Sequence, residues 1–257
     1  MRGLTDKRII VTGGCGSIGS AVARRFIEEG SIVVLADLLP TNEGERLVRE
    51  IDTGRAFYVR CDICDTNSIA EALIRTDELI GGLDVVVSNA GIHDNDEVPD
   101  MSEQQWQRVL DVNLTANYRF GRAAAERLTQ NPLPTNDQGL RGVVLFTSSV
   151  AAFKPGVPCV NYSAAKAGLH SVMRTLAAAY APQRISCNAV APGTVESRLQ
   201  QENEARYENY RENVIRDTPF GRFVTPEEVA GCYAYLASED ATYITGTTLF
   251  IDGGVML

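Results

Sequence analysis

The chain has 257 residues, of which 44% are hydrophobic and 22% charged, and its formal net charge is -9. This length suits one large α/β domain or two small ones. The acidic balance argues against a nucleic-acid partner, which needs a Lys/Arg surplus to neutralise phosphates, and against an anionic membrane surface. No apolar run approaches the ~20 residues that span a bilayer. The polar stretch from Met1 to Arg8 does not resemble a signal peptide, so we expect a cytoplasmic protein.

Short apolar runs alternate with longer amphipathic stretches along the chain. The expected strands are 8–12, 32–36, 56–60, 85–88, 143–147, 185–190 and 248–251, and the expected helices include 18–29, 67–79, 103–128 and 162–180. Most of the strand-like runs are nearly continuous Val, Ile, Leu and Ala, which is typical of parallel strands buried on both faces. The alternation therefore predicts an α/β fold with a doubly wound, seven-stranded parallel sheet, the Rossmann fold.

Two segments interrupt this alternation. Residues 131–139 contain Pro, Asn and Gly and read as a surface loop, because strands continue on both sides of them. Residues 194–217 are charged, helical in pattern and placed before the final helix–strand unit. In an open α/β sheet such an insert can cover the ligand crevice at the carboxyl ends of the strands. We expect a single domain over residues 1–257 with a substrate-covering insert at about 194–217.

The first expected strand runs into a glycine-rich turn, residues 13–19 (GGCGSIG), that opens a helix. Glycines at such a turn let the backbone approach a pyrophosphate, and the helix N-terminus behind them supplies unpaired N–H groups and partial positive charge. The pattern by itself is weak, but it follows a strand and opens a helix, which is the required context. The turn therefore predicts a dinucleotide site.

The second expected strand ends in Asp37, 18 residues after Gly19. A carboxylate there can accept hydrogen bonds from both hydroxyls of an adenosine ribose and would repel a 2′-phosphate. Leu38 and Leu39 follow it, and neither they nor the glycine turn offer a basic side chain. These features favour NAD over NADP.

Tyr162 and Lys166 are four residues apart on an expected helix and so share one face. A phenol has a pKa near 10, and lowering it by about three units takes roughly 4 kcal/mol of preferential stabilisation of the phenolate. A neighbouring ammonium and an oxidised nicotinamide can supply that. Upstream, Ser148 and Ser149 follow an expected strand, and strand alternation lets only one of them face the crevice. The hydroxyl that faces the crevice can hydrogen-bond a substrate oxygen.

Together these motifs resemble the short-chain dehydrogenase/reductase superfamily in its compact branch. The resemblance covers nearly the whole chain and rests on 12–19, Asp62, 88–91, Asn113, Ser149, Tyr162, Lys166, 192–193 and 252–254. It implies that Tyr162 is the general acid/base, that Lys166 lowers its pKa and binds the nicotinamide ribose, and that Ser149 orients and polarises the carbonyl. Asn113 would hold a water in a proton relay to Lys166.

The resemblance also implies which residues hold the cofactor. Asp62 would contact the adenine, residues 89–91 would line the cofactor, and residues 192–195 would close over the nicotinamide. The full expected set is Gly13, Cys15, Gly16, Ser17, Ile18, Gly19, Asp37, Asp62, Ile63, Asn89, Ala90, Gly91, Tyr162, Lys166, Pro192, Gly193 and Val195. Because family members commonly pair through the helices around Asn113 and Tyr162 and through the C-terminal strand, we expect a homotetramer.

The glycine turn departs from the compact branch in one respect. Ser17 occupies the position of the middle glycine, and Gly13, Gly16 and Gly19 follow the spacing of the longer, sugar-nucleotide branch. A sugar-nucleotide epimerase or dehydratase is therefore one alternative, although chain length favours the compact branch. A non-catalytic NAD-bound scaffold is another, because fold does not fix function. Its signature would be loss of catalytic residues, and all four are present.

The expected reaction is the NAD(H)-dependent interconversion of a secondary alcohol and a ketone by hydride transfer, with no nucleic-acid or membrane partner. The expected pocket residues are His93, Asp94, Ala151, Phe153, Cys159, Thr194, Glu196, Arg198 and Leu199. This mixed polar lining suits a sugar, a cyclic polyol, a hydroxy acid or an acyl thioester. Arg198 either reads an anionic group of the substrate or is a surface residue paired with Glu196 or Glu202.

No metal is expected in this site, because Tyr162 and Ser149 can do the polarising. Cys61 and Cys64 form a lone C-x-x-C pair, without a second Cys pair at ligand spacing, and the chain has only two histidines, His93 and His170. Such a pair is weak evidence for zinc or redox chemistry. We expect free thiols.

Overall fold

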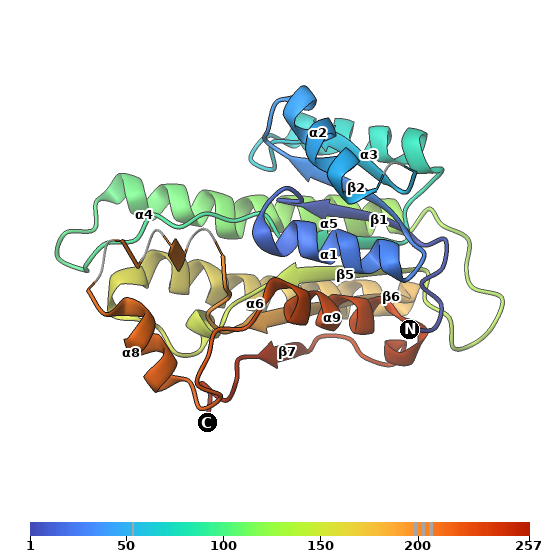
Figure 1. Cartoon of the computed structure of the whole chain (residues 1–257). Coiled ribbons are helices and arrows are strands. Elements are labelled where there is room, and N and C mark those ends of the chain that lie inside the picture. The colour runs from blue at the N-terminus through green and yellow to red at the C-terminus, as the bar shows by residue number, and fades with distance from the viewer. Residues whose placement is uncertain (53, 198–199, 202–203, 206–207) are drawn as a thin grey trace.

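The computed structural model describes the whole chain except residues 53, 198–199, 202–203 and 206–207. Its described part contains one sheet of seven parallel strands in the order β3-β2-β1-β4-β5-β6-β7 (Figure 1). The strands are β1 Arg8–Thr12, β2 Ile32–Asp37, β3 Ala56–Arg60, β4 Val85–Ser88, β5 Gly142–Thr147, β6 Ile185–Pro192 and β7 Thr248–Ile251. The expected Rossmann architecture is confirmed, and β6 runs two residues further than expected.

Helices cover both faces of the sheet. The helices are α1 Ser17–Glu28, α2 Thr41–Ile51, α3 Thr66–Ile80, α4 Glu103–Leu110, α5 Asn117–Leu128, α6 Val160–Tyr180, α8 Tyr210–Asp217 and α9 Pro226–Ala237. One apolar cluster joins the sheet to α3, α5 and α6, and a second joins it to α1, α2 and α9. No helix within the described residues is long and apolar enough to cross a membrane.

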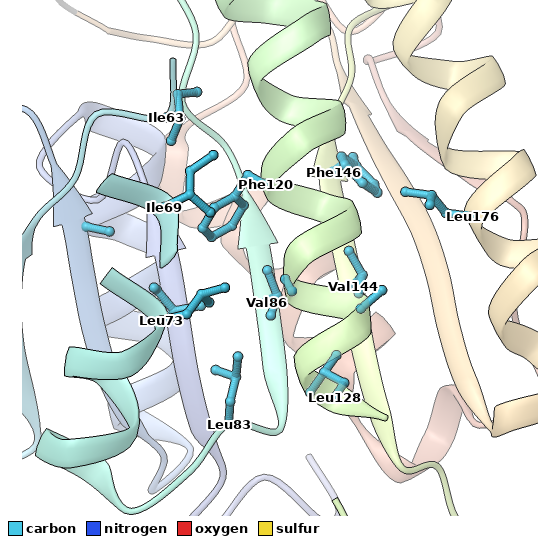
Figure 2. Packing of buried hydrophobic residues seen from close by; sticks show 14 of the residues in the cluster. Ile63, Ile69, Leu73, Leu83, Val86, Phe120, Leu128, Val144, Phe146 and Leu176 are labelled. Carbon is cyan, nitrogen blue, oxygen red and sulfur yellow. The ribbon is translucent and has the colours of Figure 1, made fainter. Parts of the chain in front are cut away.

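Neighbouring residues of the central strands belong to opposite clusters. In β4, Val86 packs into the cluster with α3, α5 and α6, whereas Val85 and Val87 pack into the cluster on the other face. Figure 2 shows Val86 and Val144 directed toward α5, which contributes Phe120 and Leu128. Because both faces are buried, the strands need apolar residues at every position, which explains their continuous apolar runs.

The strand order reverses between β1 and β4, which lie side by side at the centre of the sheet. The chain leaves β1 toward β2 on one side and continues from β4 toward β5 on the other. Open α/β sheets bind ligands in the crevice at such a switch point, outside the carboxyl ends of the strands. The glycine turn after β1 and the segment after β4 therefore flank the candidate site.

The long helix expected over 103–128 contains an irregular turn. α4 begins with a capping box between Ser102 and Gln105 and ends at Leu110, and α5 begins at Asn117. Between them, Asp111–Ala116 forms a π-helical turn, labelled η1. Asn113 and Asn117 are fully buried there. Single π-turns inside α-helices often occur at functional sites because they redirect side chains.

The start of the expected insert is paired with a residue that follows its end. Val195 pairs with Val224 as an isolated bridge, and α8 closes the segment. Figure 1 shows α8 at the same end of the molecule as the start of α4. Arg198 and Leu199, which we expected in the substrate pocket, lie outside the described residues.

Candidate active site

Two glycines allow β1 to turn directly into α1. Gly13 has a φ of +60°, and a Cβ added to it would lie 2.9 Å from Cα of Ala90. A Cβ on Gly19 would collide with the carbonyl of Gly13, so α1 can pack against the turn only with glycine there. Gly16 is different, because its nearest neighbour would be 3.4 Å away and that face of the turn is open.

The N-terminus of α1 is suited to an anion. Gly16 is its N-cap and provides no side-chain hydrogen bond, and the first turn holds no acidic residue. The first N–H groups of an α-helix have no intrahelical partner, and the helix dipole places partial positive charge there. The backbone after Gly16 therefore fits the pyrophosphate of a dinucleotide.

Asp37 lies at the tip of β2 beside this turn. Its Oδ2 accepts a hydrogen bond from the Cys15 amide at 3.0 Å, and its Oδ1 accepts one from the Leu38 amide at 2.8 Å. The Tyr58 hydroxyl donates to the carbonyls of Asp37 and Leu39, which fixes the backbone on both sides. A carboxylate has about four lone-pair positions, so two remain for the hydroxyls of a ribose.

Asn89 joins the ends of three strands. Its Nδ2 donates to the carbonyls of Thr12 and Gly13 at 3.0 and 3.2 Å, and its Oδ1 accepts from the Thr147 hydroxyl at 3.0 Å. The Thr147 hydroxyl also lies 2.6 Å from the hydroxyl of Tyr233. This network links the carboxyl ends of β1, β4 and β5.

The segment after β3 carries Asp62 and Ile63. Asp62 Oδ1 accepts a hydrogen bond from the Cys64 amide, and Ile63 is buried in the core. Cys61 is buried and Cys64 exposed, both as free thiols. Burial raises the pKa of Cys61 to about 12, which makes this thiol unreactive. The described residues contain no group of three or more residues of metal-ligand type.

α6 carries Tyr162 and Lys166 on one face. Lys166 Nζ lies 5.6 Å from the centre of the Tyr162 ring and donates a hydrogen bond of 2.7 Å to the carbonyl of Thr147. The Lys166 side chain is almost fully buried, and burial lowers its pKa to about 8. At neutral pH it is still an ammonium, placed between the end of β5 and the phenol.

Burial raises the pKa of Tyr162 to about 12, and a hydrogen bond from Ser149 pulls it in the opposite direction. The expected fall of the Tyr162 pKa below 10 is therefore not achieved by the protein groups alone, because desolvation of the phenolate outweighs the hydrogen bond from Ser149. Ser149 follows β5 in an extended conformation, and its Oγ also accepts from the Ala151 amide at 3.1 Å. Ser148 is buried, and its Oγ has no hydrogen-bond partner among the described residues.

Asn113 holds the segment that follows β4. Its Oδ1 accepts a hydrogen bond from the Ile92 amide at 3.0 Å, and its Nδ2 donates to the Ile92 carbonyl at 2.8 Å. A Cβ on Gly91 would lie 2.5 Å from Asn113 Oδ1, so this contact requires glycine at 91. The side chain of Asn113 is thus committed to the backbone of Ile92, and a water relay at this position would use its main chain.

Sequence reasoning missed two features of the site. His93 stacks on the ring of Tyr162, with 3.9 Å between ring centres and 27° between planes. Asn161, fully buried just before Tyr162, donates to the Asp94 carbonyl at 2.9 Å. No sequence pattern around His93 or Tyr162 indicates that their rings stack. A polar residue at the core-facing start of α6 is the one signal that could have pointed to Asn161.

Other residues that we expected around the nicotinamide and the substrate lie near β6 and β7. Pro192 ends β6, and a Cβ on Gly193 would lie 3.1 Å from Cα of Asp252, so the C-terminal segment packs closely on it. A cavity of about 200 Å³ adjoins Gly193 and Thr194. Phe153 lies beside β7, where its ring packs edge to face against the ring of Phe250, with 4.9 Å between ring centres.

Two further residues that we expected in the pocket, Cys159 and Glu196, contact other side chains. Cys159 Sγ lies 3.4 Å from the hydroxyl of Ser163, one residue after Tyr162. Glu196 forms an ion pair of 2.9 Å with Arg211, so its carboxylate is already partly neutralised.

Known proteins match this chain over nearly its whole length. A family model described as enoyl-(acyl carrier protein) reductase matches residues 13–256. Glucose 1-dehydrogenase 2 of Bacillus subtilis is 36% identical, with 99% of this chain and 96% of the relative covered. 3beta-Hydroxysteroid dehydrogenase 1 of Eggerthella lenta is 38% identical, with 99% of this chain and 95% of the relative covered.

A solved structure agrees with the fold. The 3-ketoacyl-(acyl-carrier-protein) reductase of Brucella melitensis, complexed with NADH, is 27% identical and superposes with a TM-score of 0.87, covering 99% of this chain and 100% of that one. The fold and these relatives thus define an oxidoreductase with a Rossmann-type sheet. The chain belongs to the short-chain dehydrogenase/reductase family.

Proposed function

We propose that this protein is an NAD(H)-dependent oxidoreductase that interconverts a secondary alcohol and a ketone. The observation that carries the proposal is the set formed by Ser149, Tyr162 and Lys166 at the carboxyl ends of the strands. The phenol of Tyr162 accepts a hydrogen bond from Ser149, and the Lys166 ammonium lies beside its ring. A bound nicotinamide supplies or accepts the hydride in this class of reaction.

Tyr162 handles the proton of the substrate oxygen. With its pKa raised to about 12 by burial, the phenol is protonated at neutral pH and is ready to donate to a ketone oxygen during reduction. Alcohol oxidation needs the phenolate, and positive charge beside the ring stabilises it. Lys166 contributes part of that charge, and Ser149 keeps the substrate oxygen within reach.

We propose NAD rather than NADP as the cofactor. Asp37 is held at the edge of the glycine turn by the Cys15 and Leu38 amides. A fixed carboxylate there fits a ribose with two free hydroxyls and repels a 2′-phosphate. The NADH complex of the Brucella melitensis relative is in line with this choice.

The relatives suggest a small-molecule alcohol as substrate. One relative is named for glucose and another for a hydroxysteroid, so the family likeness alone leaves the carbon skeleton open. The polar residues next to Tyr162, His93 and Ser149, favour a substrate that carries more than one oxygen.

The test is turnover of secondary alcohols with NAD⁺ or NADP⁺, followed by NADH or NADPH absorbance and by analysis of the product. We expect one ketone per NADH. Tyr162→Phe should lower kcat by about 10²–10⁴ while the dissociation constant for NADH stays unchanged. Tyr180→Phe, at the far end of the same helix, is the matched control and should behave like the wild type.

Two outcomes would contradict the proposal and identify a rival. Isomerisation of a sugar nucleotide without net NADH would indicate an epimerase, as the glycine spacing suggests. Tight NADH binding with no turnover of any alcohol or ketone would indicate a scaffold on the same fold.

We also propose a homotetramer. β7 is an edge strand, and Phe153 and Phe250 are partly exposed beside it, each at 38%. Exposed apolar groups along an unpaired strand edge favour association with another copy. Light scattering that shows a stable monomer at micromolar concentration would contradict this.

A further inference from the structure

His93 occupies a position that the proposed catalytic roles leave unused. It follows the turn after β4, and its imidazole stacks on the Tyr162 ring at 3.9 Å between ring centres. With an interplanar angle of 27°, the two rings are close to parallel. The imidazole therefore lies face to face with the phenol ring of the proposed acid/base.

Buried amides fix the backbone on both sides of His93. Asn113 bonds both the N–H and the carbonyl of Ile92, and Asn161 donates to the carbonyl of Asp94. Both asparagines are fully buried, and they come from η1 and α6, the elements that carry the proposed catalytic residues. Fixing the backbone of one residue costs about 1–2 kcal/mol of conformational entropy. The hydrogen bonds to Ile92 and Asp94 offset this cost, so they hold His93 in a defined place.

The carboxylate of Asp94 adds a third anchor. It accepts a hydrogen bond from Gln105 Nε2 at 3.3 Å and forms an ion pair of 3.3 Å with Arg108. α4, which carries both partners, is thereby joined to the same segment. Because the Asp94 side chain is already partnered, His93 is the more available of these two neighbouring residues for a ligand.

The imidazole is a neutral hydrogen-bond donor. Burial, with a smaller contribution from the Lys166 ammonium, lowers the pKa of His93 to about 4. Nδ1 lies 3.3 Å from Nδ2 of Asn95, and an amide nitrogen can only donate, so Nδ1 accepts and the ring proton is on Nε2. Nε2 makes no hydrogen bond with any residue that the structure describes, although the ring is only partly exposed.

We propose that His93 binds a second oxygen of the substrate through its Nε2–H, on the carbon next to the reacting carbinol. Two oxygens on adjacent carbons can reach two parallel rings 3.9 Å apart, one oxygen at Tyr162 and Ser149 and the other at His93. The substrate class is then a vicinal diol, a sugar or a hydroxyketone rather than an isolated alcohol. This inference rests on the proposed function, since it needs the reacting oxygen at Tyr162.

A role in packing alone is the competing explanation, because the stack also holds the Tyr162 ring. His93→Phe separates the two, since phenylalanine keeps an aromatic ring against Tyr162 and removes both nitrogens. His93→Gln keeps a donor and removes the ring. His170→Phe is the matched control, because His170 lies on α6 and contacts Thr248 and Phe153 instead of the site.

The experiment compares kcat/KM for vicinal cyclohexanediol with that for cyclohexanol, and for glucose with its analogue lacking the hydroxyl beside the anomeric carbon. The wild type should prefer the member with two adjacent oxygens. His93→Phe should lower that preference about tenfold, the value of one neutral hydrogen bond, mainly through KM. His93→Gln should restore part of it, and His170→Phe should leave it unchanged.

The outcomes separate this inference from the proposed function. If the wild type oxidises alcohols but has no preference within a pair, or if His93→Phe lowers both members equally, the inference is overturned and the proposed function stands. If the wild type oxidises no alcohol with either nicotinamide cofactor, while NADH binding and the thermal unfolding curve show a folded protein, both fail.

Discussion

The ammonium of Lys166 donates its one hydrogen bond among the described residues to the carbonyl of Thr147, 2.7 Å away at the end of β5. The side chain is 2% exposed, and no carboxylate within the described residues offsets the cost of burying its charge. Burial therefore lowers its pKa from 10.5 to about 8. Because the charged form is disfavoured only in the folded state, the cost to the fold is complete below about pH 8 and disappears as the pH rises to about 10.5.

Lys166→Met should abolish activity and leave the cofactor-free fold equally stable or more stable by about 1–2 kcal/mol near neutral pH. The depressed pKa corresponds to roughly 3 kcal/mol, and loss of the bond to Thr147 offsets about 1 kcal/mol of it. Wild-type stability should rise, relative to the variant, as the pH increases from about 8 to 10.5. Denaturant unfolding at both ends of that range measures this, and strong destabilisation of the variant would contradict it.

His93 should make the fold sensitive to acid. Burial lowers its pKa from 6.5 to about 4, so its stabilising contribution is complete above pH 6.5 and is lost as the pH falls toward 4. His93→Phe removes this titration, and the stability difference between the two proteins should change by up to about 3 kcal/mol over that window. Parallel curves for wild type and variant would show that the imidazole is free to ionise in the fold.

Asp37 should determine the choice of cofactor. Asp37→Ser combined with Leu38→Arg removes the carboxylate and adds a guanidinium at an exposed position, where it can pair with a 2′-phosphate. The ratio of kcat/KM for NAD⁺ to that for NADP⁺ should fall by at least tenfold. A wild type that already prefers NADP⁺, or a ratio that the double variant leaves unchanged, would refute the assignment.

Gly19 and Gly16 should respond differently to the same added methyl group. Gly19→Ala places Cβ against the carbonyl of Gly13, so the turn must shift, and both stability and NADH affinity should fall sharply. Gly16→Ala has ordinary clearance and should cost no more than about 1 kcal/mol, the difference between a glycine and an alanine N-cap. Thermal unfolding and NADH fluorescence titration distinguish the two, and similar losses in both would mean that the turn relaxes freely.

Much of the fold was determined by the sequence through local patterns. β1, β3, β4 and β7 have the expected bounds, because strands buried on both faces require an apolar residue at every position. The placement of Tyr162 beside Lys166 follows equally from helix periodicity, which puts residues four apart on one face. Asp37 at the tip of β2 follows from the polar residue that ends an apolar run.

Only the tertiary structure decided how these elements meet. In the π-turn, the Asn113 side chain forms two hydrogen bonds with the backbone of Ile92, 21 residues earlier in the chain. Helix propensity alone does not predict this turn. The stack of His93 on Tyr162 likewise joins the end of β4 to α6. The raised pKa of Tyr162 depends on burial by several elements together. Periodicity reports which face of an element is apolar, whereas contacts and desolvation depend on which elements pack against each other.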